Sequence, residues 1–106
     1  MGAATGRDVT HHGSVGFTAV GLVRTESTAV TALHIAPGGQ IGRHPATVDQ
    51  LFIVVAGAGE VSGADDVFYS VHVGQAVLWR AGEEHTTRAF ADGLTAIGVE
   101  MDNLGL

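Results

Sequence analysis

Short apolar runs separated by glycine-containing turns follow one another along most of the chain. The runs are rich in Val, Ile, Phe and Thr, which favour β-strands, and almost nothing has the period of an amphipathic helix. The pattern predicts seven or eight short strands, typical of an antiparallel sandwich or barrel. The predicted strands are 16–24, 28–36, 49–56, 59–63, 67–73, 75–80, 85–91 and 94–101.

Turn signals separate these runs. The sequence ADG at 91–93 predicts a hairpin between the last two strands, because Asp-Gly tolerates positive φ. APGGQIG at 36–42 and AGAG at 56–59 are expected to end the strands that precede them. The whole chain, 1–106, is expected to be a single domain, with a loosely structured N-terminal segment at 1–15.

The predicted strand at 49–56 carries one polar residue in an apolar row. Alternation places Gln50, Phe52 and Val54 on one face and the apolar residues 51, 53 and 55 on the other. Because both faces are apolar, this strand is expected to be central and covered on both sides. A buried amide at position 50 needs polar partners: other side chains, water, a ligand or a metal.

Composition narrows the classes of partner. The chain has 106 residues, of which 45% are hydrophobic, enough for one domain with a modest core. Its formal net charge is −6 and its basic residues are scattered, so neither nucleic acid nor an anionic membrane is an expected partner. The absence of cysteine excludes disulfides and thiolate zinc sites. No run has the length of a signal peptide or membrane span, so a cytoplasmic protein is expected.

Two sets of five residues, each with two glycines and a histidine, have spacings that matter for the interpretation of the sequence. The members of the first set, with five, one, three and six residues between them, are Gly38, His44, Ala46, Gln50 and Gly57. The members of the second set, with five, one, two and three residues between them, are Gly74, Arg80, Gly82, His85 and Ala89. In order and in an all-β sequence, the two sets resemble the two motifs of the cupin family, which implies an antiparallel jelly-roll β-barrel.

The resemblance also implies a metal site in the barrel interior. Cupins usually hold a metal with three histidines and one glutamate. By position, His44 and His85 are the remaining imidazole ligands and Gln50 is a possible oxygen ligand, while Ala46 replaces a histidine. Such a set would suit a divalent metal, Zn, Fe, Ni, Mn or Cu, held weakly and with positions left for water or substrate. The alternative is a metal-free polar patch that binds an organic molecule.

Residues near the motifs have structural as well as functional interpretations. Phe52 shares the face of Gln50 and is expected to line the pocket; Trp79 is expected to wall the pocket or to pack outside it. A carboxylate of Glu83 or Glu84 could orient His85, although a solvated turn is the simpler account. Arg80 could pair with either glutamate. No partner ligand for His11 and His12 is visible in the sequence.

These features favour two functions and leave the choice open. One is a metal-dependent enzyme, such as a dioxygenase, isomerase or lyase, acting on a small organic molecule; its catalytic residues are not predicted. The other is a metal-free barrel that binds a small molecule without turnover. A homodimer is also expected, with the strand at 16–24 as the candidate edge for subunit association.

Overall fold

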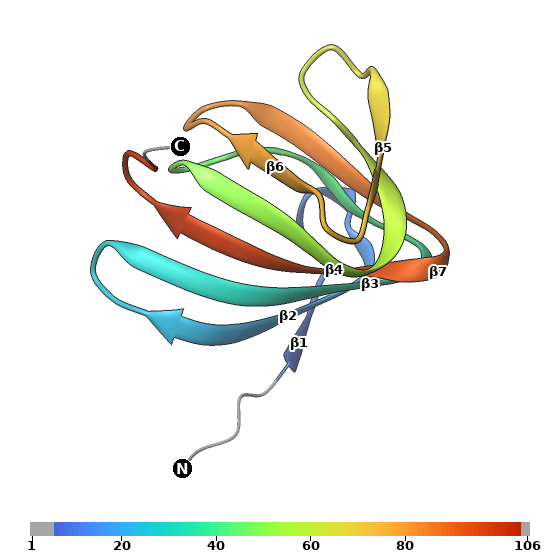
Figure 1. Cartoon of the computed structure of the whole chain (residues 1–106), viewed down its shortest axis with the longest axis horizontal. Coiled ribbons are helices and arrows are strands. Elements are labelled where there is room, and N and C mark those ends of the chain that lie inside the picture. Colours follow the sequence, from blue (N-terminus) through green and yellow to red (C-terminus); the bar gives the residue numbers. More distant parts are fainter. Residues whose placement is uncertain (1–5, 105–106) are drawn as a thin grey trace.

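The computed structural model of the protein describes residues 6–104 and is built almost entirely of strands. In chain order they are β1 (Gly6–Val9), β2 (Val15–Arg24), β3 (Thr28–Pro45), β4 (Gln50–Ser62), β5 (Phe68–His72), β6 (Ala76–Trp79) and β7 (Glu84–Met101) (Figure 1). A single 3-10 turn, His11–Gly13, lies between β1 and β2. Within residues 6–104, no helix is long and apolar enough to cross a bilayer.

Every strand pairing is antiparallel, and the expected jelly roll is confirmed. The strand order is β1-β2-β3-β7-β4-β5, and β6 pairs with β4. The first half of β4 pairs with β6 and its second half with β5, while β7 runs along both halves. Figure 1 shows that the long strands β3, β4 and β7 curve strongly, so each serves two parts of the rolled sheet.

The predicted hairpin at 91–93 is wrong, because ADG lies inside the single strand β7. The register between β3 and β7 jumps from Ile35↔Leu94 to Gln40↔Arg88, so both strands continue past an irregular corner. Gly93 has φ +75° there, and a Cβ on the facing Gly57 would overlap the Gly93 carbonyl oxygen. The glycines therefore allow strands to bend and touch, rather than to reverse.

Two other glycine-containing segments that were predicted to end strands also lie inside continuous strands. APGGQIG lies within β3, so the strand predicted at 28–36 continues to Pro45; AGAG lies within β4, which joins the strands predicted at 49–56 and 59–63. Along β4, Phe52 and Val54 are buried as the alternation predicted. β4 is central as predicted, but its second face is only partly covered: Leu51 and Ile53 are half-buried, and Val55 is 46% exposed.

One apolar core fills the interior of the rolled sheet. Its buried residues are Phe17, Ala19, Ile35, Ile41, Ala46, Phe52, Val54, Val61, Val71, Trp79, Ala89, Leu94 and Ala96. They come from β2 through β7 and from the turn after β3, so burial of apolar surface joins all the long strands.

The N-terminal part contains a strand that the sequence pattern does not predict. Gly6–Val9 form β1, which pairs with Phe17–Val20 of β2. Residues 1–5 of the segment expected to be loosely structured lie outside the described residues.

Candidate functional site

His44 and His85 lie side by side although 41 positions separate them in the sequence. They are direct partners in the β3–β7 register. Their ring centroids are 4.2 Å apart, with an angle of 58° between the ring planes. Strand pairing therefore brings together the two histidines that the motif spacing singled out.

Backbone carbonyls fix the tautomer of both rings. His44 Nδ1 lies 2.7 Å from the carbonyl oxygen of Gly42, and His85 Nδ1 lies 3.2 Å from that of Glu83. A carbonyl oxygen only accepts, so each Nδ1 carries a hydrogen, and in the neutral form of each ring Nε2 keeps its lone pair. Among residues 6–104, neither Nε2 forms a hydrogen bond with a protein atom.

His85 is held in its neutral form. Its residue is only 3% exposed, and the Trp79 ring stacks on it at 4.8 Å with an interplanar angle of 13°. Burial, and after it the charge that His44 can carry, lowers the pKa of His85 to about 4. At neutral pH the Nε2 of His85 is therefore unprotonated, the state that a metal ligand or a hydrogen-bond acceptor requires.

Gln50 faces a carboxylate across the sheet. It is the register partner of Glu100 in β7, and its Nε2 donates to Glu100 Oε1 at 2.8 Å. The amide nitrogen is thus engaged, and the amide oxygen is the atom left for another partner. A glutamate at position 50 would instead place two carboxylates against each other.

These residues line a cavity of about 240 Å³. His44, Gln50, His85 and Phe52 all contribute to its wall, as expected for Phe52. Within the part of the chain that the structure describes, Trp79 is not part of this wall; it stacks on His85 and lines a separate groove with Val61 and Val71. The cavity is smaller than the usual pocket for a drug-sized molecule, so it suits a small ligand.

The positions that depart from the cupin motifs have structural roles. Ala46 and Ala89 are buried in the core. Arg80 does not pair with a glutamate through its side chain: its guanidinium bonds Asp49 at 3.0 Å, while its backbone N–H donates to Glu83 Oε1. The bond between Arg80 and Asp49 connects the turn between β6 and β7 to the turn between β3 and β4.

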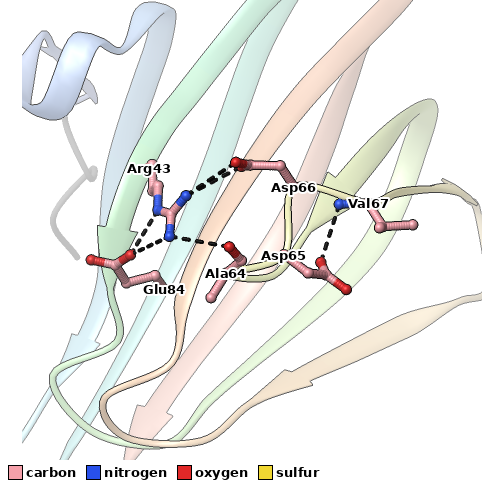
Figure 2. A network of polar contacts seen from close by, with 6 residues as sticks. All are labelled: Arg43, Ala64, Asp65, Asp66, Val67 and Glu84. Atoms are coloured by element: carbon pink, nitrogen blue, oxygen red, sulfur yellow. Dashed lines mark hydrogen bonds and ion pairs between the residues drawn. The ribbon is translucent and has the colours of Figure 1, made fainter.

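The glutamates before His85 do not orient it through their carboxylates. The Glu83 backbone carbonyl does so, and the Glu84 carboxylate accepts from Arg43 Nε at 2.7 Å (Figure 2). Arg43 also reaches Asp66 and the Ala64 carbonyl oxygen, at 3.3 and 3.2 Å. This network lies on the exposed face of the two strands that carry the histidines and ties them to the turn after β4.

Three titratable residues of the cavity wall are absent from the predicted site: Arg7, His11 and Glu100. Glu100 had a usable signal, because it continues the row of alternate residues that contains the buried Leu94 and Ala96. Arg7 and His11 had none, since neither β1 nor the 3-10 turn after it was predicted, and contacts of this segment with β2 and β3 bring them to the cavity.

Acidic and imidazole side chains do not form a complete metal cage here. Residues 6–104 contain no group of three or more His, Asp or Glu side chains placed to hold a metal ion. His44, His85 and the Gln50 amide oxygen are neutral donors in the cavity wall.

The sequence profile of the family described as Cupin domain matches residues 32–97, more than half of the chain and both motifs. The chain belongs to the cupin family. The histidine pair of this cupin, on β3 and β7, lies inside the matched region. No functionally curated protein gives a significant match.

Solved structures share the fold at low sequence identity. The polyketide cyclase RemF from Streptomyces resistomycificus is 17% identical, with a TM-score of 0.83 over 92% of this chain and 73% of that one. An RmlC-like cupin from Shewanella frigidimarina is 16% identical, with a TM-score of 0.80 over 96% and 86%. A conserved protein of unknown function from Streptococcus pyogenes is 24% identical, with a TM-score of 0.70 over 81% and 74%.

Proposed function

We propose that the cavity of this cupin binds a small organic molecule beside a divalent metal held by His44, His85 and Gln50. The observation that carries the proposal is the state of the two imidazoles. Each Nδ1–H is committed to a backbone carbonyl, which leaves both Nε2 lone pairs for a ligand. Metal-binding histidines are commonly oriented in this way by a hydrogen bond from the other ring nitrogen.

The donor set is neutral, which bears on the metal and its affinity. Two imidazoles and one amide oxygen suit Zn, Fe, Ni, Mn or Cu, and three protein donors leave positions for water or for the organic molecule. Binding is expected to be weaker than in a site with a carboxylate ligand. A bound metal would supply Lewis acidity, polarising a carbonyl group or lowering the pKa of water.

The protein's own residues would orient and shield the organic molecule. Apolar side chains of the wall, including Phe17, Ile41 and Phe52, would exclude water from one side of it. The stacked Trp79 and the Glu83 carbonyl would keep His85 in one orientation. The fold that this chain shares with the polyketide cyclase RemF is compatible with turnover, but a fold does not select a reaction.

Elemental analysis of protein purified without a histidine tag tests the metal. We expect about one metal ion per chain in the wild type, and its loss in His44→Ala and in His85→Ala. His34→Ala is the matched control, because His34 is exposed and bonds Thr95 outside the cavity. Wild-type protein that carries no metal, and that Zn²⁺, Mn²⁺, Fe²⁺, Ni²⁺ and Cu²⁺ all fail to stabilise against heat, would refute the metal site.

A metal-free binding barrel is the second candidate. It is favoured by the lack of a third His, Asp or Glu arranged with His44 and His85 in the described residues. Under this alternative the histidines act as hydrogen-bond acceptors, and a chelator such as EDTA leaves ligand affinity unchanged. Under the first proposal, the chelator weakens binding.

Homodimer formation is also part of the proposal. β2 extends past the end of its partner β1, and on this extension Leu22 and Val23 are 48% and 53% exposed. Exposed apolar residues on a partly open strand edge favour pairing with another chain. A mass by light scattering equal to one chain would rule the dimer out.

A further inference from the structure

The N-terminal strap, defined as residues Gly6–Ser14, forms one wall of the cavity. Arg7, Val9 and His11 occupy alternate positions, and all three line the cavity. Asp8, between them, points to the other side, where the Thr18 hydroxyl donates to its carboxylate at 3.2 Å. The strap therefore presents one basic and one imidazole side chain to the cavity, and because both residues are exposed they lie at its mouth.

The strap is fixed to β3, the strand that carries His44. The backbone N–H of Gly42 donates to Ser14 Oγ at 3.0 Å in a buried position, and Gln40 Nε2 donates to the Gly13 carbonyl oxygen at 3.0 Å. The His12 ring stacks on the His44 ring, 5.6 Å away at 29°. Because these contacts lie next to the histidine pair, Arg7 and His11 belong to the same site.

Arg7 is the arginine that lines this cavity, and like Arg24 it forms no ion pair with the described acidic side chains. Arg43, Arg80 and Arg88 each form an ion pair with an acidic side chain. Between residues 6 and 104, no acidic side chain pairs with Arg7, although Glu100 lines the same cavity. An arginine fork at a cavity mouth is suited to a planar anion, which it binds through two parallel hydrogen bonds.

Resting on the proposed function, we infer that the organic molecule is a small monocarboxylate with an apolar body, bound through Arg7 and His11. A neutral imidazole always carries one N–H, so His11 can donate beside the guanidinium. The Glu100 carboxylate repels a doubly charged ligand more strongly than a singly charged one. The cavity therefore favours a carboxylate over a phosphate dianion. The apolar walls, with Leu33 and Phe52 among them, accommodate the rest of the molecule.

Matched pairs of neutral and charged probes test this inference. We would measure the binding of benzoate and benzamide, hexanoate and hexanamide, and inorganic phosphate by calorimetry and by shifts in amide NMR spectra. The carboxylates are expected to bind more tightly than the amides of the same shape, and more tightly than phosphate. Arg7→Gln should weaken carboxylate binding about tenfold and leave amide binding unchanged, since a hydrogen bond to a charged group is lost.

Arg24→Gln is the control variant, because Arg24 is also a strand arginine but is not part of this cavity wall. Amides that bind as well as carboxylates, or carboxylate affinity that Arg7→Gln leaves unchanged, would overturn the inference while the proposed function stands. Metal content separates the remaining outcomes. A chain that holds metal through His44 and His85 but binds none of the carboxylates also overturns the inference, and one that binds neither metal nor any probe overturns both.

Discussion

The Gln50 side-chain amide donates to the Glu100 carboxylate at 2.8 Å, across directly paired positions of β4 and β7. This bond accounts for an amide at a position where the cupin motif has a carboxylate. The cavity wall still contains a carboxylate, that of Glu100 on the neighbouring strand β7.

Gln50→Glu is therefore expected to destabilise the protein rather than simply improve the site. It replaces a donor with a second carboxylate next to Glu100, and should lower the free energy of unfolding by about 2 kcal/mol at about pH 8. The loss should shrink at about pH 5, where the pair can share a proton, or on addition of a divalent metal. Urea unfolding measures it.

Gln75→Glu is the matched control for this change. Gln75 accepts from the His72 backbone N–H through its side-chain oxygen in an exposed turn, a role that glutamate can keep. A loss of stability at Gln75→Glu equal to that at Gln50→Glu would show that added charge, and not contact with Glu100, is responsible.

Buried His85 should make stability depend on pH below neutrality. Its pKa falls from 6.5 to about 4 on folding, so between these values the unfolded chain binds more protons than the folded one. Metal-free protein should thus lose up to about 3 kcal/mol as the pH falls from about 6.5 to about 4, and little more from this group below that. His85→Gln should flatten the profile in this window.

Urea unfolding at a series of pH values checks this expectation, and His72→Gln serves as the control at an exposed histidine. Identical slopes in the wild type and His85→Gln between these two pH values would contradict it.

Asp49 should govern stability at lower pH. Its carboxylate accepts from the Ala81 N–H, the Arg80 guanidinium and the Leu104 N–H, at 3.0, 3.0 and 3.1 Å. The Ala81 hydrogen bond is the main cause that lowers the pKa of Asp49 below its usual 3.8, assisted by Arg80 and Leu104 and opposed by burial. Stability from this group is present above the unfolded pKa and is lost as the pH falls through the folded one.

Asp49→Asn should consequently be less stable than the wild type at neutral pH, with the difference shrinking below pH 3.8, the ordinary pKa of the group. Thermal melts across this acid range measure the difference. Asp92→Asn removes the same charge from an exposed position. A gap between Asp49→Asn and the wild type that is constant with pH would indicate lost packing rather than lost charge.

Gly42→Ala should detach the strap. A Cβ at Gly42 would overlap the His12 carbonyl oxygen, and backbone atoms cannot move aside as the tip of a side chain can. We expect a loss of about 1–3 kcal/mol in unfolding free energy, with weakened ligand binding. Gly21→Ala is the control, because nothing lies within 4 Å of a Cβ built there. If both variants melt alike, the strap does not depend on this contact.

The sequence predicted the strand-rich fold and the motif histidines, which depend on local pattern and spacing. It did not predict features that depend on the pairing of strands far apart in the sequence. Motif spacing identified His44 and His85, which the β3–β7 register then joins. The corner at Gly93 could not be distinguished from a hairpin, because positive φ serves both, and only the facing Gly57 decides between them. Arg7 enters the site through a strand of four residues with little apolar patterning.

The Gln50–Glu100 pair joins positions 50 residues apart, and Arg7 adds a third element from before β2. A folding intermediate in which β7 has not docked can contain hairpins but not this cavity. Ligand binding is therefore coupled to the global folding equilibrium, and a saturating ligand should raise the melting temperature of the whole domain. Thermal stability scans can thus serve as a ligand screen, even before a reaction is known.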